Sequence, residues 1–398
     1  MTEAYLVGGV RTPVGRYGGA LSGVRPDDLA ALVVGEAVRR AGVDPAHVDE
    51  VILGNANGAG EENRNVARMA LLLAGFPDSV PGITVNRLCA SGLSAITLAA
   101  QMVSAGAADL VVAGGAESMS RGPWVMAKPE KAFAKPGPVF DTSIGWRFVN
   151  PIFQAQESTT LSMPETAEEL AALDGITREE ADEFALHSQE RAIAAIDAGR
   201  FTPEIVPVTT RAGRSEVVVD IDESPRRGTS LDALATLPSV VRPGGIVTAG
   251  NSSPLNDGAS AVIVASAAAL GQYGLVPRAR VIGGAAAGVP PRIMGIGPVP
   301  ATQKLLERTG VSLDDIDAIE LNEAFATQSL ACIRRLGLDP RIVNADGGAI
   351  ALGHPLGSSG ARIVVTLLGR LERESASLGL ATMCVGVGQG ASLLIEAA

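Results

Sequence analysis

Two cysteines and a histidine lie in segments suited to acyl transfer. Cys89 follows an apolar run and precedes small residues, at a predicted junction of strand and helix where backbone N–H groups and the helix dipole favour a thiolate. His354 lies in a glycine-rich loop, where no helical register would bury it, so proton transfer explains it best. Cys384 opens a second glycine-rich segment that contains Gly386. This set predicts attack of a thiol on a carbonyl carbon.

The other candidate residues have simpler explanations. Free cysteines are often inert core residues, and Cys332 lies on the apolar side of a predicted helix over 324–336. His47 and His187 are predicted to lie on the surface, in a polar turn and on a charged helix. Asn322 precedes the helix over 324–336, where an asparagine can cap the helix and also hold a water molecule. Neither GxGxxG nor GxxxxGK[ST] occurs between a strand and a helix, which disfavours a nucleotidase.

Length, charge and cysteine content restrict the function classes. The chain has 398 residues, which predicts two or three domains. Its three cysteines show no CxxC spacing, which disfavours disulfides and a metal site and predicts a cytoplasmic protein. A net charge of -11 argues against a nucleic-acid partner. No apolar stretch reaches bilayer length, so we expect no membrane partner either.

Strands and helices alternate in the first 118 residues, which predicts an α/β fold with a layered, largely parallel sheet. The pattern loosens between 119 and 248, around one amphipathic helix over 178–198 that Thr177 is expected to cap. A strand over 261–265 is expected to return to the first sheet. The predicted elements of the first part are strands over 4–10, 48–55, 83–88 and 110–115, and helices over 27–41, 65–74 and from Cys89 to Gly106.

The second half of the chain repeats the first. The pairs Gly42 and Gly310, Asp49 and Asp317, and Gly92 and Gly360 keep one offset of 268 positions. We therefore predict two related halves, 1–118 plus 249–272 and 273–398, with a loop domain over 119–248. Facing helix N-termini from the two halves would bring Cys89 and His354 into one pocket, although repeats can also stack without sharing a site.

Five segments together resemble the thiolases, acyltransferases that make or break a carbon–carbon bond with coenzyme A. The resemblance covers nearly the whole chain and implies a duplicated α/β fold, with two five-layered α/β/α/β/α halves and an inserted loop domain. Three further segments, 63–70, 144–148 and 163–167, resemble most the 3-oxoadipyl-CoA thiolases of aromatic and phenylacetate breakdown. The five segments are 86–92, 114–120, 322–326, 347–360 and 384–388.

The resemblance implies a role for each catalytic candidate. Cys89 would be the acylated nucleophile, His354 the base that activates it, and Cys384 the acid and base at the substrate alpha-carbon. Asn322 would hold a water that forms one oxyanion hole with His354. The backbone N–H groups of Cys89 and Gly386 would form the other.

The resemblance also implies ligands and assembly. Arg226 and Ser253 match positions that contact coenzyme A, a co-substrate, and no permanently bound cofactor is expected. A homodimer or homotetramer is implied. Two departures from the family pattern are Asp346, where many relatives have asparagine, and Pro254, where a small flexible residue is common. They are expected to alter hydrogen bonding behind the His354 loop and to stiffen the turn near the pantetheine.

The implied reaction is thiolytic cleavage of a 3-oxoacyl-CoA to acetyl-CoA and a shortened acyl-CoA, reversible as a Claisen condensation. The open alternatives are an acetoacetyl-CoA thiolase, a related condensing enzyme, which Cys384 disfavours, and an inert lipid-binding relative. For a 3-oxoadipyl chain the terminal carboxylate needs a cation. We expect at least one of Arg64, Arg68 and Arg147 to approach it, although each can instead tie the loop domain or a subunit contact together.

Overall fold

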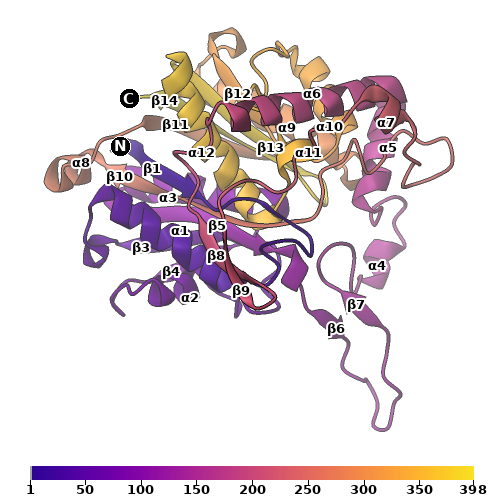
Figure 1. Ribbon diagram of the computed structural model, residues 1–398, viewed down its shortest axis with the longest axis horizontal. Helices are drawn as coiled ribbons and strands as arrows, with labels where there is room; N and C mark the ends of the chain where they lie inside the picture. Colours follow the sequence, from indigo (N-terminus) through magenta and orange to yellow (C-terminus); the bar gives the residue numbers. More distant parts are fainter. Residues whose placement is uncertain (1) are drawn as a thin grey trace.

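The computed structural model describes residues 2–398 and is built around one ten-stranded sheet (Figure 1). Two short two-stranded ribbons lie outside it. The main path runs β12 (Ala318–Leu321), β13 (Leu378–Val385), β14 (Gln389–Ala397), β11 (Ala279–Gly288), β1 (Ala4–Arg11), β10 (Asn256–Ser266), β5 (Leu110–Ser118), β3 (Glu50–Gly54) and β4 (Gly82–Val85), and β2 (Gly15–Arg16) pairs with β10.

The two ends of this path have the same topology. β3 is parallel to β5, which is followed by antiparallel β10 and β1. In the same way β12 is parallel to β13, which is followed by antiparallel β14 and β11. The halves join where β1 pairs with β11, at Leu6 and Ala279. The sequence repeat is therefore a structural repeat.

Helices cover the outer face of each half of the sheet, and two further helices lie between the halves. The helices α1 (Pro26–Ala41) and α2 (Val66–Leu73) pack on the first half of the sheet. On the second half, α9 (Pro298–Thr309) packs against β11 and β14, and α10 (Ala326–Leu336) shares a core with β12. Between them lie α3 (Ser91–Ser104) and α12 (Leu356–Glu374), which contact strands of both halves. The order is helix, sheet, helix, sheet, helix.

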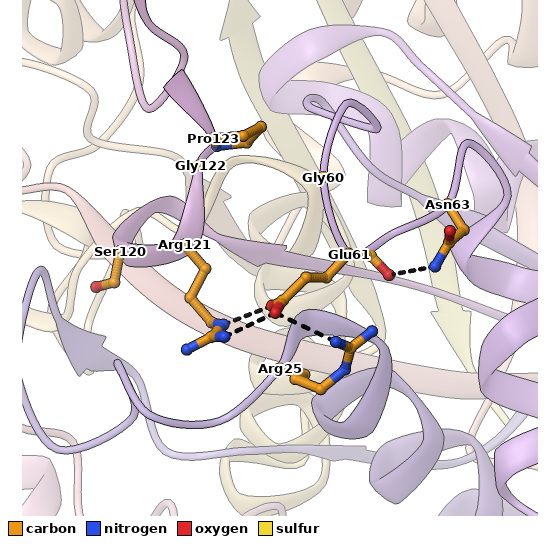
Figure 2. Close-up of a pocket in the computed structure, with 8 residues that line it drawn as sticks. All are labelled: Arg25, Gly60, Glu61, Asn63, Ser120, Arg121, Gly122 and Pro123. Atoms are coloured by element: carbon orange, nitrogen blue, oxygen red, sulfur yellow. Dashed lines mark hydrogen bonds and ion pairs between the residues drawn. The ribbon is translucent and has the colours of Figure 1, made fainter. Parts of the chain in front are cut away.

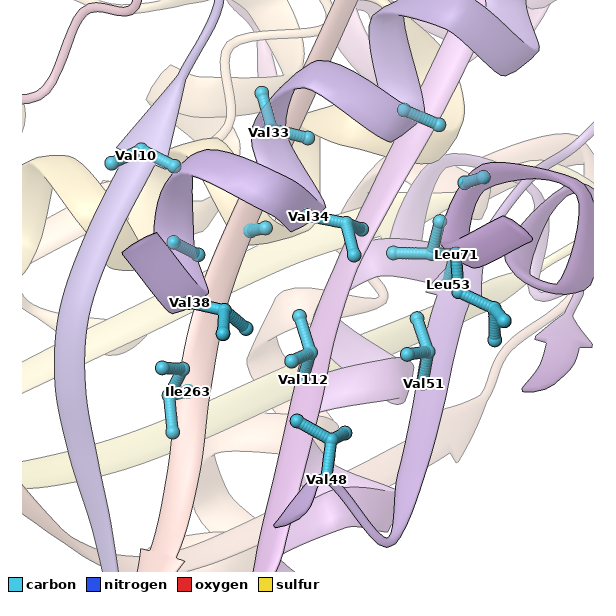
Figure 3. Close-up of a cluster of buried hydrophobic side chains, with 14 of the residues drawn as sticks. Val10, Val33, Val34, Val38, Val48, Val51, Leu53, Leu71, Val112 and Ile263 are labelled. Atoms are coloured by element: carbon cyan, nitrogen blue, oxygen red, sulfur yellow. The ribbon is translucent and has the colours of Figure 1, made fainter. Parts of the chain in front are cut away.

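The core beneath α1 shows why these segments form these elements (Figure 3). Val34 and Val38 lie one helical turn apart and point at the sheet. Val51 and Leu53 lie two positions apart in β3, so their side chains share the face of the sheet that meets the helix. Gly42 ends α1 in a left-handed conformation with φ of 70°, which favours glycine.

The two central helices approach each other backbone to backbone. A Cβ atom on Gly92 would lie 2.7 Å from the carbonyl oxygen of Gly357, and one on Gly360 would lie 2.3 Å from the backbone nitrogen of Leu93. Only glycine fits at such an approach. Both helices begin beside this contact, so their N-terminal ends lie together.

One predicted element is wrong at its end. The strand predicted over 83–88 stops at Val85, and a 3₁₀ turn over Leu88–Ala90 carries Cys89 to the start of α3. Hydrogen bonds to side chains replace the hydrogen bonds between strands here. The Asn86 side chain accepts the backbone N–H of Leu88 at 2.8 Å, and the Ser91 hydroxyl accepts the backbone N–H of Arg87 at 2.9 Å.

Several short elements and the 20-residue helix α6 (Arg178–Asp197) make up the middle of the chain, whose separation as a loop domain stays a proposal. Thr177 caps α6 as predicted, in a capping box with Glu180. No helix within residues 2–398 has the length and apolar character needed to cross a membrane. The remaining elements are β6 (Trp124–Met126), β7 (Val139–Asp141), α4 (Pro151–Gln154), α5 (Met163–Asp174), α6 (Arg178–Asp197), β8 (Val208–Ala212), β9 (Ser215–Val219), α7 (Leu231–Ala235), α8 (Ala267–Tyr273) and α11 (Ala349–Leu352).

Candidate active site

Four of the residues selected from the sequence line one cavity. Cys89, His354, Cys384 and Ser253 surround a volume of about 60 Å³. They come from the turn before α3, the loop before α12, the end of β13 and the turn before β10. The other lining residues are mainly apolar, and they are Met119, Ile144, Met163, Pro254, Leu255, Met294, Ala324, Phe325 and Leu356.

Cys89 is a neutral thiol in this cavity. Part of the residue opens to the cavity, but protein atoms surround the sulfur and burial raises the pKa of the thiol to about 11. The backbone N–H groups of Gly386 and of Cys89 itself face the sulfur and lower the pKa, while the charge of Glu117 raises it. The backbone donors favour the thiolate, as expected from the sequence, but burial outweighs them and the resting thiol is neutral.

His354 is held in the form of a base. Burial, and secondarily the charge of Arg362, lower the pKa of its imidazole to about 3. Its Nδ1 lies 2.6 Å from the Ser359 hydroxyl, which itself donates to the carbonyl oxygen of Pro355 at 2.9 Å. The ring must then donate from Nδ1, which leaves the lone pair on Nε2. Nε2 is buried and has no hydrogen-bond partner within residues 2–398.

Ser359 is the residue that sequence reasoning missed. It lies in the first turn of α12, five positions after His354, where a hydroxyl can reach back to the loop. The sequence does contain a signal for this contact, because a serine lies shortly after the loop histidine, at a predicted helix start.

Cys384 is the second thiol of the cavity. It lies near the end of β13 and is buried, which raises its pKa well above the ordinary value for a cysteine. The neighbouring Cys89 raises the pKa further. A neutral thiol at this place can donate a proton. Cys332, in contrast, is fully buried in α10 and donates to the carbonyl oxygen of Gly295, so its predicted core role is confirmed.

Asn322 is fully buried directly after β12. Neither its amide nitrogen nor its amide oxygen has a hydrogen-bond partner within residues 2–398. A buried unpaired polar group costs about 1–3 kcal/mol, so two such atoms on one side chain indicate a polar ligand or water. Its close neighbours Ala324 and Phe325 line the cavity.

Arg226 lies in a groove that leads to the cavity. The groove has a volume of about 460 Å³ and is also lined by Arg16 and Tyr17. Pro254 and Leu255 line both the groove and the cavity, so the turn that contains Pro254 forms the threshold between them. A proline at this position fixes φ and stiffens that threshold.

The departure at Asp346 has a structural explanation. Its buried carboxylate pairs with Arg200 at 2.6 Å and with Arg373 in the last turn of α12. The aspartate thereby ties Arg200, which follows α6, to the last turn of α12.

The three arginines considered for the acyl carboxylate differ in their surroundings. Arg68 donates to the carbonyl oxygens of Asp78 and Val80, and Arg64 is exposed. Arg147 is half-buried and makes one hydrogen bond, to Asn57 Oδ1 at 3.3 Å. None of the three lines the cavity with Cys89.

A second, larger cavity lies apart from the selected residues (Figure 2). Its volume is about 590 Å³, and Figure 2 shows Arg25 and Arg121 turned toward the shared carboxylate of Glu61. Both cations are already paired and the cavity is a broad depression, so it offers no reactive group.

Family models match both halves of the chain: the thiolase N-terminal domain over residues 4–268 and the thiolase C-terminal domain over residues 275–397. The chain belongs to the thiolase family. It is therefore an acyltransferase, and the resemblance inferred from the sequence is confirmed.

Relatives that match the full length of the chain support the same family assignment. This thiolase is 56% identical to the beta-ketoadipyl-CoA thiolase of Pseudomonas aeruginosa, over 99% of each chain. It is 54% identical to the 3-oxoadipyl-CoA/3-oxo-5,6-dehydrosuberyl-CoA thiolase of Escherichia coli, over 100% of each. Among solved structures, the acetyl-CoA acetyltransferase of Bacillus anthracis has a TM-score of 0.94 at 44% identity, over 100% of this chain and 99% of that one. The thiolase fold is confirmed.

Replacing Ser359 by alanine tests how the imidazole is held. Without the hydroxyl, Nδ1 loses its partner and the ring is no longer fixed with its lone pair on Nε2. If His354 is the base for Cys89, we expect acylation of Cys89 by acetyl-CoA to slow by about 10- to 100-fold, within the range that general-base catalysis contributes. Rapid quenching and mass spectrometry measure this rate.

The matched control is Ser358→Ala, because the Ser358 hydroxyl pairs with Ser260 and not with the histidine. Alkylation of Cys89 by iodoacetamide should shift to higher pH in Ser359→Ala alone. Equal pH profiles for the two variants would contradict the role of Ser359.

Proposed function

We propose that this thiolase cleaves 3-oxoadipyl-CoA with coenzyme A, giving acetyl-CoA and succinyl-CoA through an acyl group on Cys89. The observation that carries the proposal is the single cavity lined by Cys89, His354 and Cys384 at the end of a groove. The substrate named for the Pseudomonas aeruginosa and Escherichia coli relatives supports the choice of acyl chain. The same residues would run the reverse Claisen condensation.

In the first half-reaction, His354 Nε2 accepts the proton of Cys89 while the sulfur attacks C3 of the substrate. The bond between C2 and C3 breaks, which leaves a succinyl thioester on Cys89 and the enolate of acetyl-CoA. Cys384 gives its proton to the enolate carbon. Both transfers fit the resting state, in which the two thiols and the imidazole are neutral.

Two sets of donors would stabilise the oxygens that gain charge. The N–H groups of Gly386 and Cys89 face the sulfur, so they would hold the oxygen of the carbon that becomes bonded to it. A water on the unpaired amide of Asn322, together with protonated His354, would hold the enolate oxygen.

In the second half-reaction, the thiolate of Cys384 takes the proton of an incoming coenzyme A, whose sulfur attacks the succinyl carbonyl. Cys89 leaves and recovers its proton from His354, so both thiols and the imidazole return to their starting forms. Arg226 lines the groove and Ser253 lines the cavity, which supports the proposal that both contact coenzyme A, a co-substrate. Cytoplasmic location stays a prediction.

An acetoacetyl-CoA thiolase is the second candidate. The cavity holds only about 60 Å³ and has mainly apolar walls, which suits a short uncharged acyl group. A relative named acetyl-CoA acetyltransferase, from Syntrophomonas wolfei, is 45% identical over 99% of each chain.

Replacement of Cys384 and replacement of Cys89 should impair different steps of the reaction. Cys384→Ala should still acylate Cys89 from acetyl-CoA, because that step uses Cys89 and His354. It should lose cleavage and the exchange of the alpha-protons of acetyl-CoA with solvent, by about 100-fold or more. Cys89→Ala should form no acylated peptide. Unimpaired proton exchange in Cys384→Ala, followed by NMR in deuterated buffer, would refute the assignment.

Substrate choice is tested with three 3-oxoacyl thioesters. 3-Oxohexanoyl-CoA has the chain length of 3-oxoadipyl-CoA but ends in a methyl group. We expect the native enzyme to show kcat/KM at least about 10-fold higher for 3-oxoadipyl-CoA, the lower end of what a hydrogen bond to a charge contributes. A preference for acetoacetyl-CoA would favour the second candidate instead.

Assembly as a homodimer or homotetramer is also proposed. The edge strand β4 exposes Ile83, and α2 beside it exposes Leu73. The β6–β7 hairpin extends away from the body of the molecule (Figure 1) and exposes Trp124 and Phe133. Static light scattering at assay concentration should give the mass of two or four chains. A mass of one chain would contradict self-association.

A further inference from the structure

We propose that Arg147 binds the terminal carboxylate of the acyl group and that Asn57 positions it. The inference rests on the proposed function and names the residue that selects the substrate. The succinyl group has two methylenes between its thioester and its carboxylate. The cation must therefore come from a segment that forms the cavity wall itself.

Four arginines lie within three residues of a cavity-lining residue. Arg121 is paired with Glu61, and Arg292 with Glu169 at 3.3 Å. Arg87 donates to Ser94 on α3 and to Gln389 on β14, which fixes its guanidinium between these two elements. Arg147 remains. Within residues 2–398 no carboxylate lies within 4.0 Å of its guanidinium nitrogens.

The backbone around Arg147 is held against the cavity. Ile144, three residues earlier, forms part of the wall. Ser143 donates to the carbonyl oxygen of Met119, another wall residue, at 2.8 Å, and the Trp146 indole donates to the carbonyl oxygen of Leu161 at 3.2 Å. The arginine thus extends from a segment that is anchored on both sides of the wall residue.

Asn57 holds the Arg147 side chain, and its backbone is bonded to a carboxylate that also binds a neighbour of the cavity wall. Its Nδ2 donates to Thr142 at 2.9 Å, so Oδ1 is free to accept Arg147 at 3.3 Å. The backbone N–H of Asn57 donates to Glu117 at 3.1 Å, and the same carboxylate accepts the N–H of Gly357 at 2.9 Å. Gly357 is adjacent to Leu356, which lines the cavity.

The chemistry of the pair suits a carboxylate ligand. A guanidinium has five N–H donors in a planar fork, and Arg147 uses one of them, in a bond longer than the usual 2.9–3.0 Å. The remaining donors can form a bidentate pair with a carboxylate. A methyl-ended acyl chain would gain nothing from this cation, so the residue acts on substrate choice.

The experiment compares kcat/KM for 3-oxoadipyl-CoA and 3-oxohexanoyl-CoA in the full-length enzyme. In Arg147→Ala, the ratio of the two values should fall by about 10- to 150-fold, the range of a hydrogen bond to a charged group. Arg147→Lys should recover part of the ratio, because it keeps the charge but loses the fork. Asn57→Ala should lower the ratio less, since the cation remains but is no longer directed.

The matched control is Arg64→Ala, an exposed arginine of another family-specific segment, which should keep the native ratio. Thermal unfolding and light scattering report whether each variant keeps its fold and assembly. An unchanged ratio in Arg147→Ala, or an equal fall with both substrates, overturns the role of Arg147 even when the native enzyme prefers 3-oxoadipyl-CoA. If the native enzyme shows no such preference, the proposed substrate fails first.

Discussion

The backbone contact between α3 and α12 is the constraint on which the rest of the structure depends. Each half of the repeat contributes one central helix, and the helices meet where a Cβ atom on Gly92 or Gly360 would collide with the partner backbone. Because side chains are absent at the contact, the two helix starts lie close enough for the turn before α3 and the loop before α12 to share a cavity. Duplication followed by close packing thus produces a site that neither half contains alone.

The buried site is uncharged at rest, and its surroundings explain how this is maintained. Burial raises the pKa of both cavity thiols and lowers that of His354, so no member carries a charge before substrate enters. Arg362, buried behind the loop, adds to the effect because a second positive charge nearby is costly. Charge then appears only during proton transfer, when the donors of Gly386 and Cys89 are already in place.

Much of the fold could be predicted from the sequence, because the repeat and the alternation of strands and helices are local patterns. The catalytic candidates were also visible, since Cys89, His354 and Cys384 lie in glycine-rich or turn segments. The resting protonation of Cys89 was not visible, because it depends on burial by residues distant in the chain. The end of β4 was misplaced for a related reason: hydrogen bonds from Asn86 and Ser91 replace the strand ladder. Ser359 required knowledge of which way the His354 ring faces.

Substrate choice depends on two opposing requirements. Proton transfer favours an uncharged cavity, whereas the carboxylate of the acyl group needs a cation. The walls around Cys89 are mainly apolar, which favours neutral proton transfer but excludes an unpaired carboxylate. A cation inside the cavity would also disturb the chemistry, because a positive charge near the thiols favours their ionised forms and opposes protonation of His354. A cation outside it, such as the proposed Arg147 on the anchored segment that follows Ile144, avoids both effects. The Arg147 side chain is held on this segment by its hydrogen bond to Asn57. The proposal therefore assigns charge selectivity and acyl transfer to different residues.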